Sequence, residues 1–101
     1  MSDICVLGNF VADNSFYADK LPVKGQTIFG NGYNVGPGGK GSNQAIAAAR
    51  LGSKVNFLGK VGDDDNGKMA LELYKKNKID SKTVFVSKDH PTGVAGIMVN
   101  K

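Results

Sequence analysis

The fold of this chain can be worked out from one stretch, "VGPGGKGSNQAIAAARLG", which runs from Val35 to Gly52. Four glycines and a lysine stand directly ahead of an alanine-rich run that favours a helix. Glycines allow a ligand to approach the backbone closely, and the start of a helix exposes unpaired N–H groups. Three kinds of site fit this pattern: a phosphate loop, a dinucleotide loop, or a floor on which a polar small molecule sits.

The spacing excludes the phosphate loop. A Walker A motif needs a glycine, four residues, and then Gly-Lys followed by Ser or Thr. Here Gly39 and Lys40 are followed by Gly41, and Asn34 occupies the position of the first glycine. The hydroxyl that would hold magnesium comes one residue late, at Ser42.

The dinucleotide loop matches better but lacks its strand. Gly36, Gly38 and Gly41 satisfy G-x-G-x-x-G, and Asp63 follows at a suitable distance. That fingerprint requires a strong hydrophobic strand leading straight into the glycines, and the residues before Gly36 are short and glycine-broken. The pattern therefore disfavours a dinucleotide site.

The third kind of site uses every polar residue of the region. Lys40 supplies a positive charge, and Asn43 supplies both a donor and an acceptor. Asp13 follows the first expected strand and could reach the same crevice at the carboxyl end of that strand. A carboxylate, an amide and an ammonium suit a polyhydroxylated ligand. A glycine-rich connector ahead of a capped helix remains the alternative.

Helices alternate with apolar strands along the chain, which predicts an α/β fold with a parallel sheet. The expected strands are Asp3–Gly8, Lys54–Gly62, Thr83–Ser87 and Thr92–Asn100. The expected helices run through Ala45–Arg50, capped by Ser42 or Asn43 and ending at Gly52, and from Gly67 to about Lys76. The turn-rich residues before Val35 predict short strands in a small twisted sheet away from the main core.

Composition fits one soluble globular domain. The chain has 101 residues, of which 41% are hydrophobic and 22% charged, and a net charge of +4. Its one lysine cluster, Lys75, Lys76 and Lys78, falls late in an expected helix, where a solvated face explains it better than nucleic-acid binding does. Cys5 is the only cysteine, so no internal disulfide is possible, and we expect it to be buried as a small hydrophobe.

Targeting signals are missing from the sequence. The N-terminus lacks the basic region and the long apolar core of a secretory signal, and no run approaches the ~20 apolar residues of a membrane span. We therefore expect a cytoplasmic location and no membrane partner. The last expected strand has nothing after it to cover its edge, so we also expect a portion of a larger protein.

The glycine stretch resembles the N-terminal signature of the ribokinase family, also called the phosphofructokinase-B family of carbohydrate kinases. The resemblance rests on "GGKGSNQAIAAARLG" and on "VLGNFVAD", "LPVKGQT", "KVGDDDNG" and "TGVAGIMVN", which occur in the family's order. It implies a ribokinase-like fold with a parallel central sheet flanked by helices and a small β-sheet lid. Residues 1–101 would be the N-terminal portion, with lid strands at roughly 14–37 and 92–101.

The resemblance also implies roles for single residues. Asp13, Gly39, Lys40 and Asn43 match the residues that line the family's sugar site. Phe16 and Thr92 are candidate lid contacts, although Phe16 could equally pack within the lid sheet. The G-x-D-x-x-G stretch from Gly62 to Gly67 is interpreted as structural.

The implied activity is phosphorylation of ribose or a related small sugar by ATP with Mg²⁺, and with a monovalent cation such as K⁺. The family's catalytic Gly-Ala-Gly-Asp motif and nucleotide site lie C-terminal and do not occur here, so no catalytic residue is assigned and the chain alone is expected to be inactive. A homodimer through the lid is implied. The alternatives are a non-catalytic sugar-binding or dimerising remnant and a nucleoside kinase of the same superfamily.

One position departs from the family pattern. Ribokinases commonly carry an asparagine two residues before the sugar-binding aspartate, and Val11 stands there in this chain. Loss of an amide that bonds a hydroxyl changes which sugar fits. Ribose, deoxyribose and other small sugars therefore all remain candidate substrates.

Overall fold

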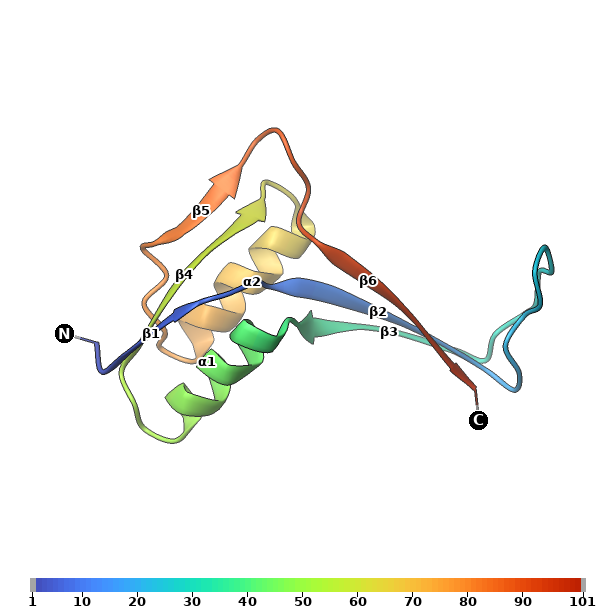
Figure 1. Ribbon diagram of the computed structural model, residues 1–101, viewed down its shortest axis with the longest axis horizontal. Coiled ribbons are helices and arrows are strands. Elements are labelled where there is room, and N and C mark those ends of the chain that lie inside the picture. The colour runs from blue at the N-terminus through green and yellow to red at the C-terminus, as the bar shows by residue number, and fades with distance from the viewer. Residues whose placement is uncertain (1, 101) are drawn as a thin grey trace.

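A computed structural model describes residues 2–100, which form two three-stranded sheets and two helices (Figure 1). The strands are β1 (Ile4–Leu7), β2 (Val11–Ala18), β3 (Gly32–Gly38), β4 (Val55–Gly62), β5 (Val84–Ser87) and β6 (Val94–Asn100), and the helices are α1 (Lys40–Arg50) and α2 (Asp65–Lys76). One sheet has the order β1-β4-β5 and is entirely parallel. In the second sheet, of order β3-β2-β6, β2 is antiparallel to β3 and parallel to β6.

The core lies between the parallel sheet and the two helices. Phe57 of β4 and Tyr74 of α2 are fully buried, with ring centroids 4.8 Å apart. Ala45 of α1 and Ala70 of α2 have no exposed surface, because their small side chains let the helices lie close to their neighbours. The prediction of a parallel sheet with flanking helices is confirmed. Among residues 2–100, neither helix is long and apolar enough to cross a bilayer.

The prediction that Cys5 is buried is wrong. Cys5 is exposed, and Leu7 keeps 78% of its surface. The two residues pair with Asn56 and Leu58, on the face of the sheet opposite the buried Phe57. No helix within residues 2–100 covers that face, so the apolar run of β1 is covered on one side only.

The second sheet contains longer strands than the predicted short ones. β2 begins at Val11, directly after Phe10, and residues 19–31 contain no strand. Phe10 and Ala12 are buried in the core, so β2 starts there and runs outward with a strand on each side. Figure 1 shows this sheet extending away from the two helices.

Helix α1 begins earlier than expected and without the predicted side-chain cap. Its N-cap is Gly39, and neither Ser42 nor Asn43 caps it. The buried Ser42 hydroxyl instead accepts a hydrogen bond from the Tyr74 hydroxyl at 3.0 Å, which joins the first turn of α1 to α2. Burial raises the pKa of Tyr74, and the bond to Ser42 partly offsets that rise.

Candidate functional site

A hollow of about 590 Å³ opens where β1 ends, α1 begins and the second sheet leaves the core. The residues that line it are Leu7, Gly8, Asn9, Val11, Asp13, Gly39, Lys40, Gly41, Asn43, Gln44 and Ala95. It therefore lies at the carboxyl end of a parallel strand and beside the start of a helix, the usual place for a ligand in an α/β sheet.

The floor of the hollow depends on backbone that no larger residue could replace. A Cβ atom on Gly8 would lie 2.9 Å from the Cα of Gly41, and a Cβ atom on Gly41 would lie 2.9 Å from the Cα of Gly8. Gly39 has φ +98°, and a Cβ atom there would overlap the carbonyl oxygen of Asn9. Glycine at these positions allows the start of α1 to lie directly on the chain that leaves β1.

Asp13 is held in the wall of the hollow by the second sheet. It lies in β2 between Gly36 of β3 and Ala95 of β6, and it is half-buried. Its carboxylate lies against Gly38, where a Cβ atom would overlap both carboxylate oxygens. Since alternate residues of a strand face opposite sides, Ala12 enters the core while Asp13 faces the hollow.

Two further polar side chains come from the first turn of α1. Lys40 is the first residue of the helix, and its side chain is exposed. Asn43, also exposed, lies later in the same turn, and its backbone N–H donates to the carbonyl of Gly39 at 2.9 Å. An ammonium and an amide thus border the same hollow as the carboxylate of Asp13, which gives it donors and acceptors for several hydroxyl groups.

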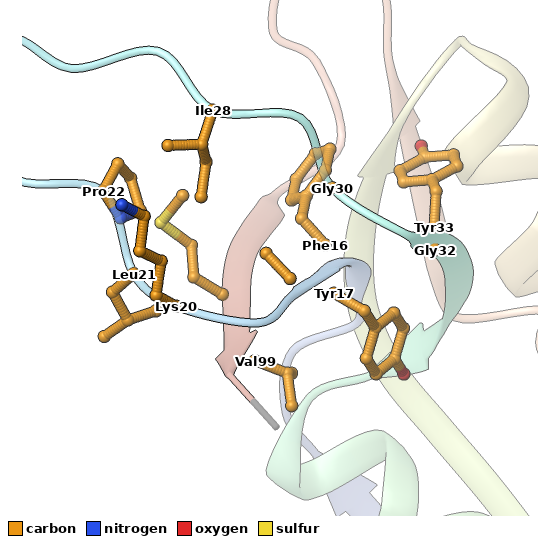
Figure 2. A pocket seen from close by; sticks show the side chains of 12 residues that line it. Phe16, Tyr17, Lys20, Leu21, Pro22, Ile28, Gly30, Gly32, Tyr33 and Val99 are labelled. Atoms are coloured by element: carbon orange, nitrogen blue, oxygen red, sulfur yellow. The ribbon is translucent and has the colours of Figure 1, made fainter.

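The structure brings four of the six predicted site residues together. Asp13, Gly39, Lys40 and Asn43 all line the hollow. Phe16 instead stacks against Tyr33, with ring centroids 5.1 Å apart, and both line a separate apolar hollow of about 500 Å³ in the second sheet (Figure 2).

Thr92 is the other predicted site residue that does not line the hollow. It is buried in the segment before β6 and hydrogen-bonded to Asp64 and Gly62. A contact of Phe16 or Thr92 with a ligand stays a prediction.

Sequence reasoning did not single out Asn9, Gln44 and Ala95, which are among the residues that line the hollow. Asn9 follows the end of β1, and Gln44 follows the predicted site residue Asn43. Their places beside these features could have indicated that they line the site. Ala95 enters through β6, far along the chain, and no local pattern could have shown that it pairs with Asp13. Within residues 2–100 no group of three or more His, Cys, Asp or Glu side chains could hold a metal ion.

Comparison with known proteins identifies the family of this chain. The profile of the pfkB family carbohydrate kinases matches residues 1–101. The chain belongs to the pfkB family of carbohydrate kinases. It is 47% identical to the ribokinase of Bacillus subtilis over 78% of this chain and 27% of that protein. It is 44% identical to the deoxyribokinase of Salmonella typhi over 97% of this chain and 32% of that protein.

The fold agrees with solved structures of the same family. The Arabidopsis thaliana ribokinase, complexed with ribose and ATP, superposes with a TM-score of 0.88 at 32% identity, over 98% of this chain and 32% of that chain. The chain therefore spans about a third of the length of these pfkB relatives.

Proposed function

We propose that the complete gene product transfers a phosphoryl group from ATP to ribose or a related small sugar, and that this chain supplies the sugar-binding floor. One observation carries the proposal: Asp13, Lys40 and Asn43 border a single hollow whose floor is glycine backbone. Further support comes from relatives that are ribokinases and a deoxyribokinase.

Each polar side chain has a distinct role in this proposal. The carboxylate of Asp13 accepts hydrogen bonds from sugar hydroxyls, which are donors, and so selects a polyol. Asn43 both donates and accepts, and Lys40 donates to sugar oxygens. Gly39 lets the sugar lie against the backbone. Together these contacts hold the sugar in one orientation, which is a large part of what phosphoryl transfer requires of a protein.

ATP, as the phosphoryl donor, completes the reaction, together with Mg²⁺ and a monovalent cation such as K⁺. The described residues contain no group of three or more His, Cys, Asp or Glu side chains that could hold a metal ion, so we assign no metal ligand to residues 2–100. We also assign no catalytic base to them. These groups are proposed to be held by other residues of the complete gene product.

Val11 bears on which sugar is preferred. Its side chain lines the hollow two residues from Asp13 and offers no hydrogen bond. A hydroxyl group facing an apolar wall loses its bonds to water without replacement, which penalises the sugar that carries it. We therefore propose that 2-deoxyribose is accepted at least as well as ribose.

The second sheet is proposed to act as the lid and as the surface of a homodimer. Its strand β2 presents Asp13 to the hollow, and β6 contributes Ala95. Exposed apolar side chains lie farther out on the same sheet, including Phe16, Tyr33 and Met98, which would be suited to contact with a second copy. A cytoplasmic location remains a prediction.

The test is a kinase assay on the complete gene product with ATP, Mg²⁺ and either ribose or 2-deoxyribose, following ADP release. Asp13→Asn should lower kcat/KM for the sugar by about tenfold or more, because a hydrogen bond to a charged group contributes about 1.5–3 kcal/mol. Asp89→Asn is the matched control, since Asp89 is exposed in the loop after β5 and away from the hollow.

Three outcomes would contradict parts of the proposal. Equal activity of Asp13→Asn and Asp89→Asn would remove Asp13 from the site. Sugar binding without ADP release would favour the non-catalytic sugar-binding alternative. Phosphorylation of nucleosides in preference to free sugars would favour a nucleoside kinase.

A further inference from the structure

The G-x-D-x-x-G stretch surrounds Thr92. Asp64 Oδ1 accepts from the Gly67 N–H at 2.8 Å and from the Thr92 hydroxyl at 2.6 Å. Asp64 Oδ2 accepts from the Thr92 N–H at 2.9 Å, and Thr92 Oγ1 accepts from the Gly62 N–H at 2.8 Å. These four residues, here named the Thr92 anchor, join the end of β4, the start of α2 and the segment that leads into β6.

The two glycines of the stretch leave room for Thr92. A Cβ atom on Gly62 would lie 2.5 Å from the Thr92 nitrogen and 2.7 Å from the His90 carbonyl oxygen. A Cβ atom on Gly67 would overlap the Gly62 carbonyl oxygen and lie 3.1 Å from Thr92 Oγ1. Gly62 is therefore explained by the close approach of the segment around Thr92, and Gly67 by the carbonyl of Gly62, with Thr92 Oγ1 in tight contact as well.

Helix capping alone does not account for Asp64. An N-cap needs one side-chain oxygen to accept one backbone N–H of the first turn, here that of Gly67. The other two hydrogen bonds of the carboxylate both go to Thr92, whose side chain is 4% exposed. Two of the three hydrogen bonds that the Asp64 carboxylate accepts therefore come from a residue outside its own helix.

Thr92 lies two residues before the start of β6, the strand that reaches the hollow. The next carbonyl, that of Gly93, accepts from the Ala12 N–H at 2.9 Å, and β6 then runs parallel to β2. In this ladder Ala95 pairs with Asp13, and both line the hollow. The Thr92 anchor therefore sets the point at which β6 leaves the core, three residues before the hollow is reached.

We propose that Asp64 and Thr92 are positioning residues for the sugar site, acting through β6 on Ala95 and Asp13. This inference rests on the proposed function. Neither side chain lines the hollow, so their effect on sugar binding is indirect. Without the hydrogen bonds of the Thr92 anchor, the start of β6 is no longer fixed to the core. Ala95 and the paired Asp13, which line the hollow, are then held less firmly.

The experiment compares Thr92→Val, Thr92→Ser and a control, Thr83→Val, in the complete gene product. Valine keeps the shape of threonine but removes both side-chain bonds of the anchor, whereas serine keeps the hydroxyl. Thr83 is a matched control, because its hydroxyl also donates one hydrogen bond, to the carbonyl of Phe57 at 2.7 Å, and accepts one, from Asn56 at 2.9 Å, but beside β4 and β5.

A second variant separates capping from anchoring. In Asp64→Ser the shorter side chain still accepts from the Gly67 N–H, because serine is a good N-cap, but it does not reach Thr92. It therefore tests the anchor even if Thr92→Val fails to fold.

Two readouts are taken for each variant: KM for sugar and for ATP, and hydrogen exchange of residues 93–100. Thr92→Val and Asp64→Ser should raise the sugar KM by about tenfold, leave the ATP KM within about twofold, and speed exchange in β6. Thr92→Ser should give wild-type values of the sugar KM and of exchange in β6, and Thr83→Val should change neither.

Either of two results would overturn the inference: an unchanged sugar KM in the folded Thr92→Val and Asp64→Ser variants, or an equal rise in the KM of sugar and ATP. Failure of the proposed function is distinguishable, since the wild-type protein would then show no sugar kinase activity. The exchange of β6 would still report on the anchor.

Discussion

The hydrogen bond between Tyr74 and Ser42 offers a quantitative test of how the floor of the hollow is held. Both groups are buried, with 0% and 1% of their surfaces exposed, and the bond at 3.0 Å joins α2 to the first turn of α1. Tyr74→Phe removes only the hydroxyl and keeps the ring against Phe57 and Phe10. Ser42 is then left buried without its donor.

The expected loss of stability depends on whether one partner of the hydrogen bond is removed or both are. A buried polar group without a partner costs about 1–3 kcal/mol, whereas removal of both partners is close to neutral. Tyr74→Phe and Ser42→Ala should therefore each lower the free energy of unfolding by about 1–3 kcal/mol. The double variant should lose clearly less than the sum, with a coupling of about 1 kcal/mol or more.

The assay is urea denaturation of the complete gene product and its three variants, followed by far-ultraviolet circular dichroism. Equal slopes against urea among the four proteins would show that the comparison concerns stability alone. If the double variant lost as much stability as the two single variants added together, the reasoning would be refuted, because Tyr74 and Ser42 would then not be hydrogen-bond partners.

Three further predictions concern the hollow and the anchor. Val11→Asn should raise the ratio of kcat/KM for ribose over 2-deoxyribose by about tenfold, since an amide can pair with the extra hydroxyl; parallel assays with the two sugars measure it. Gly38→Ala should displace the carboxylate of Asp13 and raise the sugar KM by about tenfold, with a smaller effect on the ATP KM, as steady-state kinetics would show. The hydrogen bonds from Thr92, first its hydroxyl and then its N–H, hold the pKa of Asp64 below its usual 3.8. Their contribution to stability is therefore present at neutral pH and lost as the pH falls below about 4, so the melting temperatures of wild type and Asp64→Asn should converge there.

Local patterns were sufficient for most elements and for the expectation that four predicted site residues lie around one hollow. The alanine-rich run and its closing glycine predicted α1, and the apolar alternation predicted β4. Asp13 and Lys40 could be brought together from the sequence because strand ends and helix starts share one edge of an α/β sheet. The hollow bears out that geometry, since both residues line it.

Features that depend on distant partners could not be predicted. The exposure of Cys5 depends on whether anything covers the outer face of the parallel sheet, which no local pattern reports. β2 begins at Val11, which pairs with Gly38 of β3, and from Ala12 onward it also pairs with β6, a strand that lies far along the chain. Ser42 looked like a helix cap, but its hydroxyl is engaged by Tyr74, on the other helix.

The contact between Gly8 and Gly41 has a consequence for protein engineering. A side chain at either position would enter the backbone of the other, so the base of the hollow cannot be reshaped one residue at a time. Val11, Gln44 and Ala95 border the same space without that constraint. A library aimed at new sugar specificity should therefore vary these three side positions and leave the paired glycines untouched.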